Sequence, residues 1–130
     1  MTNLTTKHVF TFDALGSAAL GILLAVFAGP LDDLFGPALP STALLVVGIG
    51  LLPWAAFNLW IARSSRYPRN AVVLNVIGDA AWVLASLALV LFAPGGLTVL
   101  GLLAVIAVGL FVLAVGLTKS AGLRSPMLAA

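Results

Sequence analysis

The chain has 130 residues, of which 62% are hydrophobic and only 8% are charged, and its mean hydropathy is +1.22. Soluble domains carry about 25% charged residues and roughly half apolar residues, so this composition excludes an ordinary soluble domain. The absence of cysteine excludes disulfides, thiolate metal sites and cysteine nucleophiles.

The chain contains few of the residue types and motifs that enzymes use for catalysis. The sequence contains no glutamate and one histidine, His8, on a polar N-terminal arm where a solvated side chain is expected. No HExxH, GxSxG or P-loop motif occurs, and these motifs carry the metal, acyl-transfer and phosphate chemistry of many enzymes. We therefore expect a protein that is not an enzyme and has no metal or cofactor.

Four apolar segments run along the chain, separated by short stretches rich in glycine, proline or arginine. A bilayer core of about 30 Å needs roughly 20 helical residues, and none of the segments shows the alternation of a barrel strand. Short connections between them favour antiparallel neighbours. The sequence predicts an all-α membrane fold, an antiparallel four-helix transmembrane bundle in one domain (1–130) with spans at 9–28, 41–62, 71–93 and 97–117.

The basic residues indicate how the chain is threaded. Cytoplasmic ends of membrane spans carry an excess of lysine and arginine. All six basic residues flank the same ends of the predicted spans, and Asp32 and Asp33 flank the opposite ends. We expect a multi-pass protein of the bacterial inner membrane with both termini cytoplasmic; besides Lys7, the topology determinants are Arg63, Arg66, Arg69, Lys119 and Arg124.

The N-terminal segment also has features of a signal peptide. Lys7 precedes an apolar stretch, and small residues occur near Ala28, as at a cleavage site. Asp13 interrupts that stretch, which favours a retained first span.

The isoelectric point of about 9.7 reflects a net charge of only +2. Because the basic residues serve the topology, we expect no nucleic-acid partner and a weak attraction to anionic lipid headgroups. With such short loops, the expected partners are the lipid bilayer and other membrane helices, of a second copy or of a larger complex.

Polar residues inside the spans are the candidate site. At 1.5 Å per residue, Asp13, Asn58 and Asn75 lie about 6 Å from the cytoplasmic ends of their spans, and Asp79 lies about 12 Å in. Asn58 and Asn75 can meet across the hairpin formed by 41–62 and 71–93. We expect an intramembrane polar seam that comprises Asp13, Ser17, Trp54, Asn58, Asn75, Asp79, Trp82 and Ser86.

Two interpretations of this seam stay open. Hydrogen bonds among its side chains can hold the helices in register, or Asp79 can be a titratable site for a proton, a cation or a substrate. No lysine or arginine is predicted at the depth of Asp79, so we expect a neutral acid bonded to Asn58 or to a tryptophan indole, or a proton carrier. For Asp13, a salt bridge to Arg63 or Arg66 is expected.

Two further features concern the helices themselves. Pro53 lies in the middle of 41–62, where a missing N–H should kink the helix. The segment 97–117 contains no ionisable residue. We therefore expect this segment to face lipid or a partner.

Several short motifs resemble small four-span inner-membrane proteins of bacteria. These motifs are Asp13 at the start of the first span, Leu51-Leu-Pro53 with Trp60 in the second, Gly78-Asp79-Ala-Ala-Trp82 with Ser86 in the third, and a closing Gly122-Leu-Arg124. The resemblance covers nearly the whole chain. It implies the four-span fold and the location, and no activity.

The chain is also similar to small multidrug-resistance transporters, which have four short helices and work as dimers. That resemblance implies a membrane-embedded glutamate in the first helix. Here the first span has only Asp13, and the deeper acid is Asp79 in the third span.

Two functions follow from these observations. The first is a non-catalytic scaffold, accessory subunit or modulator of a membrane complex, because the chain offers no soluble recognition domain. The alternative is a homodimeric proton-linked transporter of small lipophilic or cationic solutes that uses Asp79.

The basic-residue asymmetry generates the first testable prediction. A C-terminal fusion to a reporter that is active only in the periplasm should be silent, and a fusion to a reporter that is active only in the cytoplasm should be active. A periplasmic signal from the C-terminal fusion would contradict the predicted topology.

Overall fold

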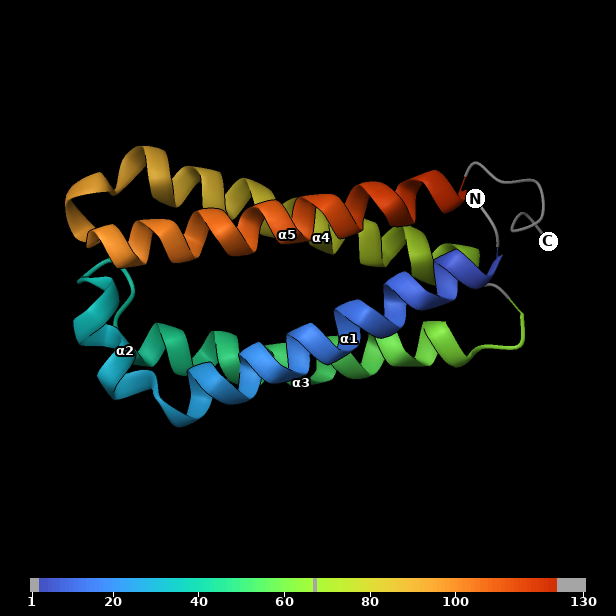
Figure 1. The fold of residues 1–130 in the computed structure, drawn as a ribbon, viewed down its shortest axis with the longest axis horizontal. Coiled ribbons are helices and arrows are strands. Elements are labelled where there is room, and N and C mark those ends of the chain that lie inside the picture. Colours follow the sequence, from blue (N-terminus) through green and yellow to red (C-terminus); the bar gives the residue numbers. More distant parts are fainter. Residues whose placement is uncertain (1–2, 67, 124–130) are drawn as a thin grey trace.

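The computed structural model describes residues 3–66 and 68–123 (Figure 1). The long helices are α1 (Asn3–Val26), α3 (Ser41–Arg63), α4 (Arg69–Phe92) and α5 (Val99–Leu123), and the short elements are α2 (Ala28–Phe35) and a 3-10 turn, η1 (Pro94–Gly96). The four long helices are each long and apolar enough to cross a membrane. The predicted all-α four-helix bundle is confirmed.

The last helix extends beyond its predicted end at Leu117. Thr118 and Ser120 each donate a hydroxyl hydrogen bond to the carbonyl four residues earlier, at 2.9 and 2.7 Å, so these polar side chains are accommodated within a helix. Arg69 at the start of α4 donates from Nη1 to the carbonyl of Leu123 at 2.8 Å. A cation is favourable at a helix C-terminus. The extension places Lys119 inside α5.

The connection between the first two predicted spans contains the short helix α2. The amides of Phe27 and Leu31 bond to Leu23 and Phe27 at 3.0 and 2.9 Å, so α2 follows α1 almost without a break. Gly36 ends α2 with a φ of 105°, a conformation that glycine adopts without a steric penalty. The Asp32 carboxylate accepts the backbone N–H of Ser41 at 3.2 Å and so caps the start of α3.

The bundle consists of two tightly packed hairpins, α1 with α3 and α4 with α5 (Figure 1). A Cβ on Gly48 would lie 2.7 Å from the carbonyl oxygen of Gly21, so α1 and α3 meet backbone to backbone. In the second hairpin, Gly109 and Gly116 let α5 approach α4 closely. Small residues at membrane helix contacts permit such close packing. The helices α3 and α4 are consecutive but make little contact, so the predicted hairpin 41–62/71–93 is not a packing unit.

Separate contacts join the two hairpins at each end of the bundle. At one end, Ala38 donates its N–H to the carbonyl of Gly96 at 2.8 Å, and Thr98 donates to Phe35 at 3.0 Å. We call these four residues the α2 clasp. At the other end, where α1 begins and α5 ends (Figure 1), an apolar plug closes the bundle; it consists of the buried residues Phe10, Ile61, Ala62 and Val72.

The contact between α1 and α3 generates a prediction for Gly48. In Gly48→Ala the new Cβ would also lie 2.8 Å from the Ala25 amide nitrogen. Because backbone cannot rotate away, the helices must separate, and overpacking of this kind costs about 1–3 kcal/mol of unfolding free energy. Thermal unfolding in detergent, followed by circular dichroism, measures the loss.

Gly50→Ala is the matched control, two residues further along the same helix. Nothing lies within 4 Å of a Cβ at Gly50, and alanine is favoured over glycine inside a helix by roughly 0.5–1 kcal/mol. Equal destabilisation by both variants would contradict the close approach at Gly48.

Candidate functional site

Lys119 is the centre of the buried polar residues. Its side chain is 0% exposed, and its Nζ lies 2.5 Å from Oδ2 of Asp13 and 2.8 Å from Oδ2 of Asp79. Nζ also donates hydrogen bonds to Oδ1 of Asn75 at 2.7 Å and to Oδ1 of Asn58 at 3.1 Å. The four partners come from α1, α3 and α4, so one ammonium group connects all four long helices. We call these five residues the Lys119 cluster.

The apolar plug separates this cluster from the nearer end of the bundle. Three plug residues each lie three positions from a cluster residue, toward the end of the bundle where α1 begins and α5 ends: Phe10 from Asp13, Ile61 from Asn58, and Val72 from Asn75. The ring centroid of Phe10 is 4.9 Å from the Lys119 Nζ. Lys119 itself lies about 6 Å from the end of α5 at 1.5 Å per residue. This depth matches the depth predicted for Asp13, Asn58 and Asn75, which explains why the side chains converge.

The structure corrects two predictions, about the partners of Asp79 and of Asp13. Asp79 does have a basic partner, Lys119. Within residues 3–66 and 68–123, neither the Trp54 indole nor the Trp82 indole forms a hydrogen bond with Asp79. Asp13 pairs with Lys119 and not with the predicted Arg63 or Arg66. Lys119, which was also predicted to be a determinant of topology, is fully buried; its role in topology stays a prediction.

The basic residues of the loop between α3 and α4 keep positions at the bundle end. Arg63 is the last residue of α3, and Arg69, the first of α4, bonds to the end of α5. Arg66 lies in the loop between them. Arg124, the remaining predicted topology determinant, lies outside the described residues.

The predicted polar seam is present in part. Ser17 donates to Oδ1 of Asp13 at 3.1 Å, one helical turn away. Asn58 and Asn75 do come together, through their shared bond to Lys119, and Asn58 also donates to the carbonyl of Trp54 at 3.0 Å. Ser86 lies apart from the cluster and packs against Gly109 of α5.

Sequence reasoning missed Lys119 because the predicted span stopped two residues before it. A signal was available in the glycines of α5. Gly109 and Gly116 are seven residues apart and share a helix face, and Lys119 follows Gly116 by three residues on the same face. The helix predicted to face lipid or a partner therefore supplies the central residue of the site.

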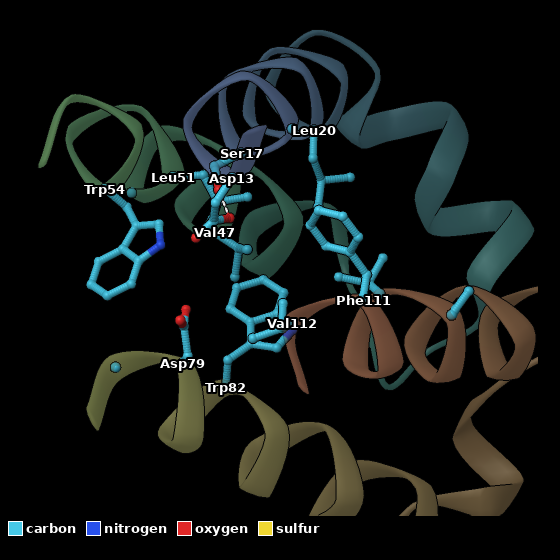
Figure 2. Close-up of a pocket in the computed structure, with 15 residues that line it drawn as sticks. Asp13, Ser17, Leu20, Val47, Leu51, Trp54, Asp79, Trp82, Phe111 and Val112 are labelled. Carbon is cyan, nitrogen blue, oxygen red and sulfur yellow. Dashed lines mark hydrogen bonds between the residues drawn. The ribbon is translucent and has the colours of Figure 1, made fainter. Parts of the chain in front are cut away.

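A cavity of about 590 Å³ lies between the two hairpins, beside the Lys119 cluster (Figure 2). Its wall is apolar and aromatic except at the end where Asp13, Ser17 and Asp79 contribute polar atoms. Lys119, Asn58 and Asn75 are not part of the wall. The remaining lining residues are Gly16, Leu20, Val47, Gly50, Leu51, Trp54, Gly78, Trp82, Ala107, Val108, Phe111 and Val112.

The two seam tryptophans belong to the cavity wall. The Trp54 ring from α3 rests on Gly78 of α4, where any Cβ would collide with the ring, so Trp54 bridges the two helices that otherwise make little contact. Among the described residues, the buried Trp82 Nε1 and Asn75 Nδ2 have no hydrogen-bond partner. Buried donors without acceptors are costly.

The electrostatics of the cluster define what it can do. In the described part of the chain, it joins two carboxyl groups to one ammonium group, so with all three ionised it carries one excess negative charge. A buried group of this kind needs a counter-charge, which a proton or a bound cation can supply. Within residues 3–66 and 68–123, no three His, Cys, Asp or Glu side chains are placed to hold a metal ion.

Comparison with known proteins gives no match. The chain matches no protein-family model, no curated protein sequence and no solved structure.

The charge balance of the cluster generates a prediction for Lys119. Lys119→Met keeps an unbranched side chain, one atom shorter than that of lysine, but leaves two carboxyl groups without a cation. Breaking a buried ion pair by removing one partner costs about 3–5 kcal/mol of unfolding free energy. Asp79→Asn leaves the Asp13 carboxylate paired with the Lys119 ammonium group, so it should lower the free energy of unfolding far less. Thermal unfolding of the purified variants in detergent measures both.

The double variant Lys119→Met/Asp79→Asn separates charge from shape. It removes one of the two uncompensated carboxyl groups, so it should be more stable than Lys119→Met alone. If the second substitution lowers stability further, the excess charge is not the cause of the loss, and the interpretation of the cluster as a charge balance is wrong.

Proposed function

We propose that this protein is a non-catalytic, proton-linked carrier of small solutes in the bacterial inner membrane, with both termini in the cytoplasm. The observation that carries the proposal is the cavity between the two hairpins, whose polar end is formed by Asp13 and Asp79. Ionisable residues inside membrane spans are costly and commonly mark solute or proton pathways. The role rests on the cavity and on the charges beside it.

The arrangement of the hairpins supports alternating access. The α2 clasp joins the hairpins beyond one end of the cavity through backbone hydrogen bonds. The Lys119 cluster joins them at the other end, because Lys119 of α5 bonds to Asp13 of α1 and Asn58 of α3. Carriers expose a fixed site to each side in turn by rocking one rigid half against the other. The two hairpins are the two halves here. The α2 clasp and the Lys119 cluster are two separate sets of contacts, one at each end of the cavity, that can break in turn.

The unequal numbers of acids and bases support the proton linkage. Lys119 compensates one carboxylate charge, and the second carboxyl group takes up a proton from whichever aqueous side the cavity opens to. Asp13 lies in one hairpin, and Asp79 lies with Lys119 in the other, so the acid that stays ionised decides whether the remaining ion pair lies between the hairpins or within α4–α5. Solute movement and proton movement are then coupled through the same cluster.

The site is formed by the helices of one chain. The proposal therefore does not require the second copy expected from the sequence. The accessory role predicted first from the sequence has different consequences: no solute flux, and stable co-purification with other membrane proteins after gentle extraction, which mass spectrometry detects.

Reconstitution into liposomes tests the carrier role. An imposed pH gradient, reported by an encapsulated pH-sensitive dye, should dissipate faster when a solute of the right class is added. A panel of primary amines, quaternary ammonium ions, carboxylates and neutral alcohols covers the main classes. Asp79→Asn should abolish the solute-dependent flux, because an amide does not titrate near neutral pH.

Asp33→Asn is the matched control, since it removes an exposed carboxylate from α2, far from the cluster. Its flux should equal that of the unmodified protein. If the unmodified protein, Asp79→Asn and protein-free liposomes behave alike with every solute of the panel, the carrier proposal is wrong and the accessory role takes its place.

A further inference from the structure

We infer that Lys119 is a detachable link between the two hairpins, in which Asp13 holds the hairpins together and Asp79 lets them separate. This inference deepens the proposed carrier function, on which its biological role rests, because it names the residues that open and close one end of the bundle. It follows from the way in which the oxygen atoms around the Lys119 ammonium group are divided between the hairpins.

Each hairpin offers the ammonium group the same two acceptors, one carboxylate oxygen and one amide oxygen. The α1–α3 hairpin supplies Oδ2 of Asp13 and Oδ1 of Asn58, at 2.5 and 3.1 Å from Nζ. The α4–α5 hairpin, to which Lys119 itself belongs, supplies Oδ2 of Asp79 and Oδ1 of Asn75, at 2.8 and 2.7 Å. We call these two sets the α1–α3 acceptor pair and the α4–α5 acceptor pair.

The α4–α5 acceptor pair is sufficient to keep Lys119 paired when the hairpins separate. An ammonium group has three N–H donors, and four oxygen atoms surround it here. After separation, Asp79 balances its charge, Asn75 accepts a second hydrogen bond, and the third N–H meets water in the opened space. Separation therefore does not leave an uncompensated buried ammonium group, which would be strongly destabilising.

The α1–α3 acceptor pair is held in place by its own hairpin. Ser17 donates a hydrogen bond to Oδ1 of Asp13 at 3.1 Å, one turn along α1. The amide Nδ2 of Asn58 donates to the carbonyl of Trp54 at 3.0 Å, one turn along α3. Both acceptors thus keep their orientation without the ammonium group. Lys119 can return to them without any rearrangement of the α1–α3 hairpin.

The α4–α5 hairpin also remains assembled without the link. Arg69 of α4 donates to the carbonyl of Leu123 of α5 at 2.8 Å. A Cβ on Gly116 of α5 would lie 3.4 Å from the Cβ of Asp79, so α5 packs directly against the residue that pairs with Lys119. The hairpin therefore moves as one unit that carries both members of this ion pair.

The apolar plug is the other contact between the hairpins at this end. Val72 of α4 packs there with Phe10 of α1 and Ile61 of α3. Apolar contacts of this kind are non-directional, so they do not select one position of Lys119. Neither acid belongs to the plug, and substitution of either acid leaves the plug residues unchanged.

The division of the acceptors gives the two acids opposite roles. Without the Asp79 carboxylate, the ion pair of Lys119 with Asp13 remains among the described residues, and it joins the hairpins. Without the Asp13 carboxylate, the pair with Asp79 remains, and it lies within one hairpin. Asp13→Asn and Asp79→Asn each leave one acid and one base. They differ only in the hairpin that carries the acid, so each variant is the matched control of the other.

Distances between spin labels test this inference. The chain contains no cysteine, so His8→Cys on α1 and Asn70→Cys on α4 introduce two unique labelling sites, both exposed, at this end of the bundle. Double electron–electron resonance measures the distance between them for the full chain in nanodiscs. We expect the ratio of the separated to the joined population to be higher in Asp13→Asn than in Asp79→Asn by about tenfold or more, since the remaining ion pair favours opposite sides of this equilibrium.

A second pair of labels serves as the control at the other end of the bundle. Leu45→Cys on α3 and Leu100→Cys on α5 are exposed positions near the α2 clasp. Their distance should be the same in the two acid variants, because the backbone hydrogen bonds of the clasp are unchanged. A longer distance at this end in Asp13→Asn would indicate a general loss of packing and would overturn the inference.

The two amides give an independent pair of variants that keeps both acids. Asn58→Leu removes an acceptor from the α1–α3 acceptor pair, so it should favour separation of the hairpins. Asn75→Leu removes an acceptor from the α4–α5 acceptor pair, so it should favour the joined state. Leucine is close to asparagine in shape, and the same two label pairs measure the effect.

Equal distance distributions in Asp13→Asn and Asp79→Asn would overturn the inference, and so would a longer distance in Asp79→Asn. The outcome is separable from the liposome test, because the distances are measured without any solute. Opposite effects of the two acids without solute flux would keep the link and overturn the carrier role. Flux together with equal distances would keep the carrier role and overturn the link.

Discussion

The structure depends on the burial of one ammonium group. An unpaired charge inside a membrane bundle is costly, so the Lys119 side chain requires partners from the helices around it. Asp13, Asn58, Asn75 and Asp79 supply them from three other helices. The register of each helix along the membrane normal follows from this requirement, because a shift of one turn would remove its side chain from the reach of Nζ.

Around that interaction the molecule is layered along its length. The apolar plug, with Phe10 at 0% exposed, excludes water from the cluster at the end where α1 begins and α5 ends. The cavity follows on the other side of the cluster, and the α2 clasp completes the bundle. Close glycine contacts hold each hairpin together, whereas the α2 clasp, the Lys119 cluster, the apolar plug and Trp54 join the hairpins to one another. The packing between the hairpins is less extensive than the packing within each of them.

The excess carboxyl group gives the cluster a role besides stability. A balanced pair would suffice to bury a lysine, yet two acids share one base here. The additional negative charge faces an apolar cavity beside Trp54. A proton or a bound cation can supply the counter-charge that this additional negative charge requires.

The sequence by itself determined the fold class, because long apolar segments have few alternatives to membrane helices. It also identified Asp13, Asn58, Asn75 and Asp79 as interior residues, since their cost of burial and their depth can be read along each span. The partner of the two acids was decided only by the tertiary structure. Hydropathy placed Lys119 outside the last span. The spacing of Gly109, Gly116 and Lys119 marks one helix face, but it does not indicate that α5, rather than α3, packs along α4. Pairings between distant segments depend on side-chain packing across helices, which the pattern along one helix does not specify.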